Sequence, residues 1–186
     1  MYIQGEALYI AEYSGSDRQA DYDDWTDEET QSGFNFAMED SFEEFAAFPR
    51  RQRWYAAIVR RGDDALLGFL MLSPEGSEPD LAIRVLRRHR AKGYGKEAFR
   101  LGALYCIQTL GIGELHAGCY PHNTASMRVI ATSGFERTLR GIWRRKISAQ
   151  VKRSLSSTSS CAGVSAYRMP SSEISGMVNS DPGWSG

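Results

Sequence analysis

The sequence predicts a mixed α/β (α+β) fold in which helices flank a central sheet, and three observations support this. Short apolar runs rich in β-branched and aromatic residues, bounded by polar turns, recur along the chain. Other stretches carry apolar residues at helical spacing. The 186 residues suffice for one domain with a substantial core and are too few for two typical ones. Strands mostly follow one another directly, and helical crossovers occur only in the second half, so we expect a mixed sheet.

The first fifty residues are predicted to form one strand and two short helices. Ala7–Tyr13 is apolar and aromatic, as in a strand. Residues 17–50 mix acidic with aromatic side chains at roughly helical intervals. The second of these helices is expected to begin near Asp40 and Ser41 and to end before Pro49.

The middle of the chain is predicted to hold three strands. Trp54–Arg60 and Ala65–Leu72 are apolar runs joined by the polar turn 61–64, which is typical of a hairpin. Residues 73–79 contain two Pro and a Gly and must form a loop. Asp80–Leu86 is a further short strand.

The second half alternates helices with strands. Tyr94–Leu110 has apolar residues at helical spacing and is followed by Gly111, so a helix is expected there. Glu114–Tyr120 is predicted to be a strand and Asn123–Ser133 a short helix. Phe135–Arg145 is predicted to be mostly strand.

The C-terminal part is expected to add little to the core. Residues 154–160 form a Ser-rich loop, and Val164–Met169 is a last strand. Residues 171–186 are expected to be a tail, which leaves a single domain over residues 1–170.

Composition excludes several classes of protein. No apolar run reaches the roughly 20 residues of a membrane helix, and the chain begins without a basic segment followed by an apolar one, so no secretory signal is expected. Cys106, Cys119 and Cys161 have no CxxC spacing, so neither a disulfide framework nor a metal site is expected. These features indicate a cytoplasmic protein.

The net charge of −1 conceals an asymmetry. Residues 1–50 hold two Arg against thirteen acidic residues, a net charge of −11, and residues 51–186 hold twenty basic against ten acidic residues, a net charge of +10. Such a split suggests a basic face for phosphate and an acidic face for a cationic partner. Alternatively, the acidic side chains only solvate the N-terminal helices.

Residues 90–95, Arg-Ala-Lys-Gly-Tyr-Gly, are predicted to bind a pyrophosphate. Gly93 and Gly95 let backbone N–H groups approach an anion closely, and the helix that begins there presents the positive end of its dipole. The surrounding basic side chains are Arg87, Arg88, Arg90, Lys92 and Lys96. A solvated basic turn is the alternative, but glycines, helix start and positive charge coincide here.

Two other nucleotide-binding loops fit these residues less well. Residues 93–98 match the dinucleotide fingerprint G-x-G-x-x-[G/A], and Glu114 lies nineteen residues past Gly95. However, an apolar strand should lead directly into the first Gly, whereas residues 87–92 are strongly polar, and the acidic residue should end a strand rather than start one. The Gly-Lys-Ser/Thr of a Walker A loop does not follow either.

A second motif identifies the nucleotide more closely. Arg-x-x-Gly-x-Gly at 90–95 resembles the coenzyme A loop [Q/R]-x-x-G-x-[G/A] of the GNAT family of N-acetyltransferases. Asn-x-x-Ser at 123–126, followed by Gly-Phe at 134–135, is similar to the family's N-x-x-[A/S]…G-F helix, in the family's order and spacing. The resemblance covers roughly residues 5–170 and is strongest over 80–140, the expected acetyl-CoA-binding core.

The resemblance implies the GNAT fold, a mostly antiparallel sheet of about six or seven strands with about four helices, whose fourth and fifth strands splay to admit the pantetheine arm of the cofactor. It implies acetyl-CoA as co-substrate and no metal. Val85 and Leu86 would offer backbone groups to the arm, and Arg90 would lie at the edge of the pyrophosphate. Asn123 would bond the cofactor, cap the helix, or do both. The pyrophosphate would be held by N–H groups of Ala91, Lys92, Gly93, Tyr94, Gly95 and Lys96.

Acetyl transfer to an amine needs a base for the ammonium and benefits from a proton donor for the leaving thiolate. Many family members use a Tyr as this donor, but Ile130 stands at the matching position. Ser126 instead resembles the Ser of the ribosomal-protein alanine acetyltransferase (RimJ/RimL-like) branch, where it is the proposed donor. A water-binding or packing role for Ser126 is the alternative. The expected mechanism is direct attack, without an acyl-enzyme.

Asp80 is the first candidate for the base, because it stands ten residues before Arg90, where many relatives place a Glu. It would need burial, or a bridging water, to act as a base from a reference pKa of about 3.9. Glu78, His116 and His122 are the other candidates. Cys119 is expected to be a small core residue rather than a nucleophile.

The acceptor is expected to be an amine, on a protein N-terminus or a small molecule, and cationic, since residues 1–50 match the segment that forms one wall of the family's acceptor pocket. The sequence is compatible with a homodimer, and no membrane partner is expected. A non-catalytic acyl-CoA sensor is an alternative because the family's Tyr is missing. Acetylation of an aminoacyl-tRNA is another, although the acidic N-terminal part argues against a nucleic acid.

Overall fold

The computed structural model describes residues 2–137 and 143–146, which form two β-sheets. The larger sheet is antiparallel, with five strands in sequence order. Its strands are β1 (Tyr2–Gln4), β2 (Leu8–Glu12), β3 (Trp54–Arg60), β4 (Leu66–Leu72) and β5 (Leu81–Val85). The smaller sheet, in the order β6-β8-β7, is also antiparallel. Its strands are β6 (Glu114–Ala117), β7 (Glu136–Arg137) and β8 (Trp143–Lys146).

The two sheets are joined where β5 begins. Asp80 forms a parallel bridge with His116 of β6, and the His116 N–H donates to the carbonyl of Pro79 at 2.7 Å. Beyond this bridge, β5 pairs with β4 and β6 pairs with β8. The two strands therefore separate in the way expected of the fourth and fifth strands of the family's fold.

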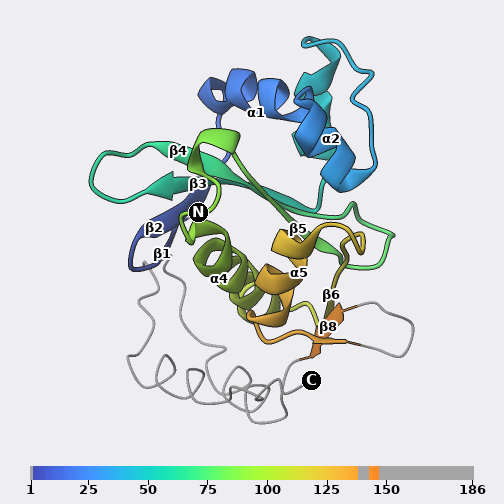
Figure 1. The fold of residues 1–186 in the computed structure, drawn as a ribbon. Helices are drawn as coiled ribbons and strands as arrows, with labels where there is room; N and C mark the ends of the chain where they lie inside the picture. The colour runs from blue at the N-terminus through green and yellow to red at the C-terminus, as the bar shows by residue number, and fades with distance from the viewer. Residues whose placement is uncertain (1, 138–142, 147–186) are drawn as a thin grey trace, which may run out of the picture.

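Helices cover both faces of the larger sheet (Figure 1). α1 (Arg18–Trp25) and α2 (Glu28–Phe34) lie on one side, and α4 (Tyr94–Gln108) and α5 (Thr124–Ala131) lie on the other. The short α3 (Phe48–Arg51) leads almost directly into β3. The mixed α/β fold with a mostly antiparallel sheet is confirmed.

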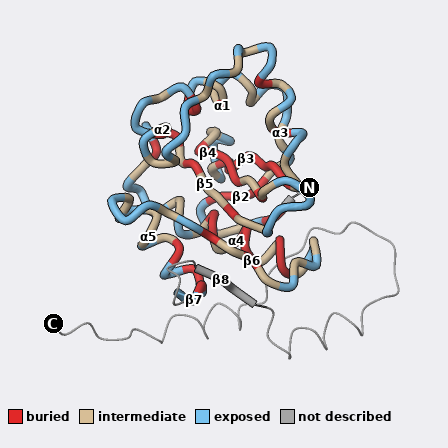
Figure 2. The backbone as a smooth tube through the Cα atoms, turned by 90° about the vertical axis from the view of Figure 1, so that its right-hand side faces the viewer, coloured by how far each residue is buried: buried red, intermediate tan, exposed pale blue. Residues whose placement is uncertain are grey.

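The main core lies between the larger sheet and α4, where Figure 2 shows buried backbone in both layers. Fully burying each large apolar side chain stabilises the fold by about 1.5–3 kcal/mol. The largest such side chains are Leu8, Ile10, Ile58, Leu67, Leu70, Leu72 and Leu81 from the sheet and Phe99 and Leu101 from α4. Helix and sheet approach closely at Gly102, because a Cβ there would lie only 2.9 Å from Leu70 Cδ1.

Several elements lie where the sequence predicts them. β3 spans the predicted residues, and β4 begins one residue later than predicted. α4 begins at the predicted Tyr94, and β6 and α5 lie inside the predicted ranges. In these segments the local pattern of apolar residues decides the structure.

The first fifty residues differ most from the prediction. β1 was not predicted, and residues 17–50 hold α1, α2 and α3 together with the 3-10 helix η2 (Glu44–Ala47), rather than two helices. Pro49 lies in the first turn of α3 instead of following the end of a helix. The first turn tolerates proline because its backbone nitrogen needs no partner there.

The number of elements also differs from the prediction. Instead of one sheet of six or seven strands, the described residues hold a sheet of five and a sheet of three. The Ser-rich loop 154–160, the strand Val164–Met169 and the tail 171–186 lie outside the described residues. Within the part of the chain that the structure describes, no helix combines the length and the apolar character that crossing a membrane requires.

Candidate active site

The loop between β5 and α4 has a backbone geometry suited to an anion. It passes through the 3-10 helix η3 (Arg87–His89) and enters α4 with Gly93 as the N-cap. Gly93 has φ +86° and Ala91 has φ +59°, so both are left-handed. Left-handed residues in a turn can direct neighbouring N–H groups to one side, and the first turn of α4 adds its own N–H groups and dipole. The loop can therefore bind a phosphate group.

Gly93→Ala is expected to lower the free energy of unfolding by about 1–2 kcal/mol, because a Cβ is disfavoured at this positive φ. Gly95 provides a matched control, since it is helical and a Cβ there would lie 3.6 Å from its nearest neighbours, Val85 and Val129. Gly95→Ala should keep or raise the stability, as Ala exceeds Gly in helix propensity by about 1 kcal/mol. Urea unfolding of both variants measures the difference, and equal losses would contradict this account of the loop.

A pocket of about 480 Å³ opens beside this loop. It is lined by α2, the end of β5, the loop itself, the first turn of α4, and α5 with its entry turn. The residues predicted from the sequence that line it are Val85, Arg90, Ala91, Lys92, Gly93, Tyr94, Gly95, Lys96, Asn123 and Ser126. Among the described residues, the lining leaves out two that were predicted for the site, Leu86 and Asp80.

Val85 and Leu86 differ in what they offer to a ligand. The Leu86 N–H donates to the Leu67 carbonyl at 2.8 Å, and the residue is 4% exposed. The Val85 carbonyl accepts from Arg90 Nε at 2.9 Å and retains a second lone pair. The structure thus directs Leu86 into the protein and leaves Val85 on the pocket wall.

Asn123 caps α5 and also faces α2. Its Oδ1 accepts from the Ser126 N–H at 3.0 Å. Its Nδ2 lies close to Gly33 of α2, since a Cβ at Gly33 would lie 3.4 Å from it. The helix-cap role is therefore present, and it holds Asn123 and Ser126 on the wall of the pocket.

Arg84 of β5 forms a buried ion-pair network under α1, beside the pocket. Its Nη1 donates to Asp24 at 2.8 Å, and its Nη2 donates to Asp21 and to the Tyr55 hydroxyl. The guanidinium lies 4.1 Å from the centre of the Trp25 ring. Burial raises the pKa of both carboxyls, and the charge of Arg84 opposes that rise. No sequence motif indicated this network, although a charged residue inside an apolar strand signals a buried pair.

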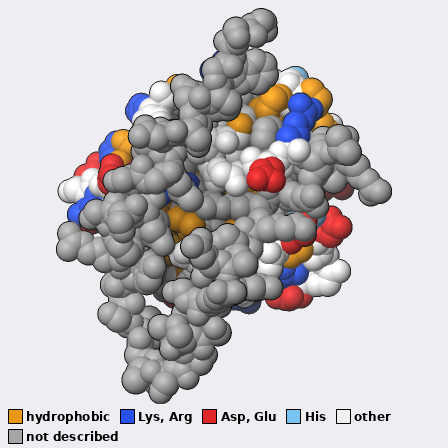
Figure 3. Space-filling view, turned by 90° about the horizontal axis from the view of Figure 1, so that it is seen from below, with side chains coloured by type: hydrophobic (Ala, Val, Ile, Leu, Met, Phe, Trp, Pro, Cys, Tyr) orange, Lys and Arg blue, Asp and Glu red, His pale blue; other side chains and the backbone are white. Residues whose placement is uncertain are grey.

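Other acidic side chains of the N-terminal segment pair with the loop before α4. Asp27 lies 3.4 Å from Arg87, and Glu29 lies 3.0 Å from Arg90. On the face drawn in Figure 3, both signs of charge occur among the described side chains. The charge split of the sequence is therefore partly an internal pairing between its two halves.

Asp80 lies at the junction of the two sheets. Burial raises the pKa of its carboxyl, His116 lowers it, and Glu78 raises it further. The carboxyl lies near Gly118, the residue after β6, since a Cβ there would lie 3.9 Å from Asp80 Oδ2. A carboxyl with a raised pKa is a better base than a free Asp, so Asp80 keeps its candidacy, whereas the side chain of Glu78 is 80% exposed.

The remaining candidates have other surroundings. His122 lines the pocket and stacks on Tyr120, with ring centres 5.8 Å apart. Cys119 is half-buried, and burial raises the pKa of its thiol, which disfavours the nucleophilic thiolate. Ile130 is 3% exposed in the main core. Within the described ranges, no group of three or more His, Cys, Asp and Glu residues is placed to hold a metal ion.

A family model described as an acetyltransferase (GNAT) domain matches residues 6–136. The chain belongs to the GNAT acetyltransferase family. The probable N-acetyltransferase YjcK of Bacillus subtilis is 28% identical to this GNAT chain over 100 residues. That alignment covers 52% of the chain and 54% of YjcK, so it spans about half the length of this relative.

Solved GNAT structures share the fold at low identity. An acetyltransferase from Agrobacterium tumefaciens str. C58 has a TM-score of 0.67 at 17% identity, over 79% of this chain and 95% of that chain. Spermidine N-acetyltransferase from Vibrio cholerae, determined in complex with CoA and spermine, has a TM-score of 0.66 at 13% identity, over 77% and 96% respectively. At these identities the likeness shows the fold alone.

Proposed function

We propose that this GNAT domain transfers an acetyl group from acetyl-CoA to a primary amine of a small molecule or of a protein N-terminus. The observation that carries the proposal is the pocket, which joins the left-handed loop and the start of α4 to the capped turn 123–126 of α5. The backbone N–H groups of residues 91–95 suit a pyrophosphate, whereas that of Lys96 donates to the Gly93 carbonyl at 3.3 Å. Lys92 and Lys96 on the lining supply positive charge. The Vibrio cholerae relative determined with CoA supports the same donor.

The reaction asks two things of the chain's own residues. The ammonium first loses a proton to a base, and the neutral amine nitrogen then attacks the thioester carbonyl carbon. The C–S bond breaks, the nitrogen loses its second proton, and the CoA thiolate takes up a proton. In this proposal Asp80 accepts the proton from the ammonium, directly or through water. Ser126, in an Asn-x-x-Ser turn like that of the RimJ/RimL-like branch, hydrogen-bonds the leaving sulfur or a water beside it.

Asp80→Asn is expected to lower kcat by about 10²-fold or more, because it removes the base. Glu78→Gln is the matched control, since Glu78 is 80% exposed and its loss should leave kcat nearly unchanged. A base acts when deprotonated, so kcat/KM of the wild type should fall as the pH drops through the raised pKa of Asp80. This fall of kcat/KM at low pH should be absent in Asp80→Asn. A larger loss in Glu78→Gln would reverse the assignment.

A non-catalytic acyl-CoA-binding module is the second candidate, because Ile130 fills the core at the position of the family's Tyr. The two functions separate in one assay, thiol release from acetyl-CoA with a panel of monoamines, polyamines and peptides with free N-termini. The proposal expects thiol release that depends on one class of amine, together with the acetylated amine. Tight CoA binding without release of thiol for any class would favour the binding module.

A further inference from the structure

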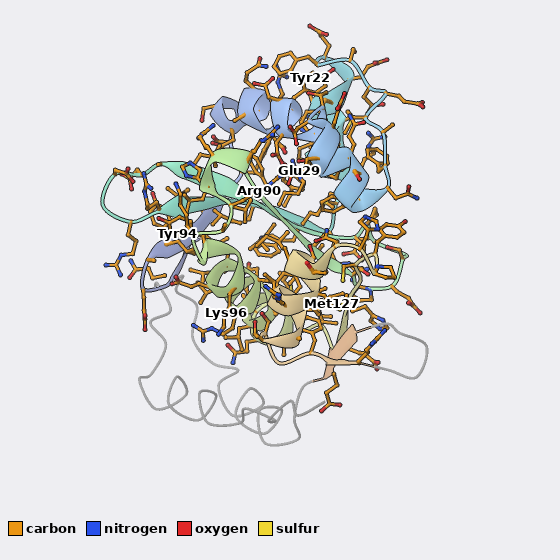
Figure 4. All side chains as sticks on the ribbon, in the orientation of Figure 1. Tyr22, Glu29, Arg90, Tyr94, Lys96 and Met127 are labelled. Atoms are coloured by element: carbon orange, nitrogen blue, oxygen red, sulfur yellow. The ribbon has the colours of Figure 1, made fainter. Side chains whose placement is uncertain are left out.

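The guanidinium of Arg90 faces α1 and α2 rather than open solvent. Its Nη2 donates to Thr30 Oγ1 at 2.7 Å and lies 3.7 Å from Asp24, and its Nη1 lies 3.0 Å from Glu29. Its Nε donates to the Val85 carbonyl. Figure 4 shows Arg90 next to Glu29, between α2 and the start of α4, with Lys96 further along α4. Protein acceptors thus contact all three nitrogens of the Arg90 guanidinium, the group that the coenzyme A motif would place at the pyrophosphate.

The helix that Arg90 holds forms one wall of the pocket. Asp27 caps the start of α2, where its side chain accepts from the Thr30 N–H, and the end of α2 lies near Asn123, the cap of α5, which approaches Gly33. Thr30 and Gly33 both line the pocket. The position of α2 therefore sets the width of the pocket between α2 and α5. The guanidinium of Arg90 links α2 to the loop between β5 and α4, and so fixes this position.

We propose that Arg90 is a positioning residue, which locks α2 to the coenzyme A loop and so fixes the width of the pocket between α2 and α5. The inference rests on the proposed function and refines the assignment of this residue. Binding of the pyrophosphate then falls to the N–H groups at the start of α4 and to the lysines. The reaction rate depends strongly on the positions of the groups around the reacting atoms, since a misplacement of about 1 Å can lower the rate about 10²-fold.

The test compares two ligands and two kinds of variant. ADP carries the pyrophosphate without the pantetheine arm, whereas CoA carries both. Arg90→Lys keeps the charge but loses the fork, and Thr30→Val keeps Arg90 and removes one of its acceptors. We expect both variants to bind ADP within about twofold of the wild type, to bind CoA about tenfold more weakly, and to raise KM for the amine; each tenfold corresponds to about 1.4 kcal/mol.

Two further variants separate positioning from unfolding. Thr30→Ser keeps the hydroxyl and should restore wild-type CoA affinity. Arg51→Lys changes another arginine that pairs with an acidic residue of the N-terminal segment, Asp40 at 3.1 Å, but that lies outside the pocket lining, and it should affect neither ligand. Thermal melting identifies any variant that fails to fold, and the Thr30→Ser rescue keeps the test decisive in that case.

The outcomes distinguish this inference from the proposed function. Parallel losses of ADP and CoA affinity in Arg90→Lys, with no effect of Thr30→Val, would make Arg90 a phosphate ligand and overturn the inference alone. A wild-type protein that binds neither CoA nor acetyl-CoA would count against the proposed function itself.

Discussion

Arg84→Met is expected to destabilise the fold by about 3–5 kcal/mol, because it leaves the buried carboxylate of Asp21 without a counter-charge and that of Asp24 with only Arg90, 3.7 Å away. Asp21 is fully buried and Asp24 is 6% exposed, so neither can recover its hydration without opening α1 from the sheet. The methionine side chain keeps much of the packing against Trp25 and Phe69, the two rings that flank the guanidinium. Urea unfolding with the wild type as reference measures the loss.

The matched control removes the acids together with the arginine. Adding Asp21→Asn and Asp24→Asn to Arg84→Met should recover most of the lost stability, since the buried charge disappears from both sides. If the triple variant is no more stable than Arg84→Met, then lost packing rather than uncompensated charge explains the effect.

The loss in Arg84→Met should also grow as the pH rises. Burial raises the pKa of Asp21 and Asp24 in the folded protein, and removing Arg84 takes away the charge that opposes the rise. A carboxyl whose folded pKa exceeds its unfolded value favours folding at low pH, and this contribution is lost as the pH rises through the folded pKa. A loss of stability that is independent of pH would contradict this assignment.

Gly68→Ala is expected to cost about 1–3 kcal/mol or more and to weaken CoA binding, because the new Cβ has no space. It would lie 2.0 Å from the Arg84 carbonyl oxygen and 2.9 Å from Val85 Cα, both backbone atoms of β5. β4 and β5 would have to move apart, and β5 carries the pocket wall as well as Arg84. Unfolding in urea and titration with CoA report the two effects.

Gly102→Ala is the control for this substitution. A Cβ at Gly102 would also be close to its neighbours, at 2.9 and 3.3 Å, but these are the two terminal methyl groups of the Leu70 side chain rather than backbone atoms. The substitution also gains about 1 kcal/mol of helix propensity. We therefore expect a small effect on stability, and an effect as large as that of Gly68→Ala would contradict the role assigned to the β5 backbone.

The sequence predicted those parts of the fold and site that depend on local pattern. The hairpin of β3 and β4 and the helix α4 follow from apolar periodicity and from the turn that precedes or ends each element. The loop before α4 follows from Gly93 and Gly95, although the left-handed Ala91 could not be foreseen because any residue type other than Gly is uncommon there.

The rest of the site depends on contacts between distant parts of the chain. Asp21 and Arg84 are 63 residues apart, and Arg90 and Thr30 are 60 apart, so no local period reveals either pair. The motif suggested a phosphate role for Arg90, and only the fold shows which acceptors surround it. The acidic surplus of residues 1–50 predicted a cationic partner, and some of these acidic side chains pair with the protein's own arginines.

The most direct measurement of the central claim follows an isotopically labelled acetyl group from acetyl-CoA into product, in the wild type and in two variants of α5. Ala125 lines the pocket and is exposed, so Ala125→Trp should fill the pocket without disturbing the core. Thr124→Trp is its control on the same helix, exposed but outside the lining.

We expect one labelled amide per released thiol in the wild type and in Thr124→Trp, and loss of both products in Ala125→Trp with its free energy of unfolding unchanged. Label that stays on CoA with every amine, or equal turnover by the folded Ala125→Trp, would contradict acetyl transfer at this pocket.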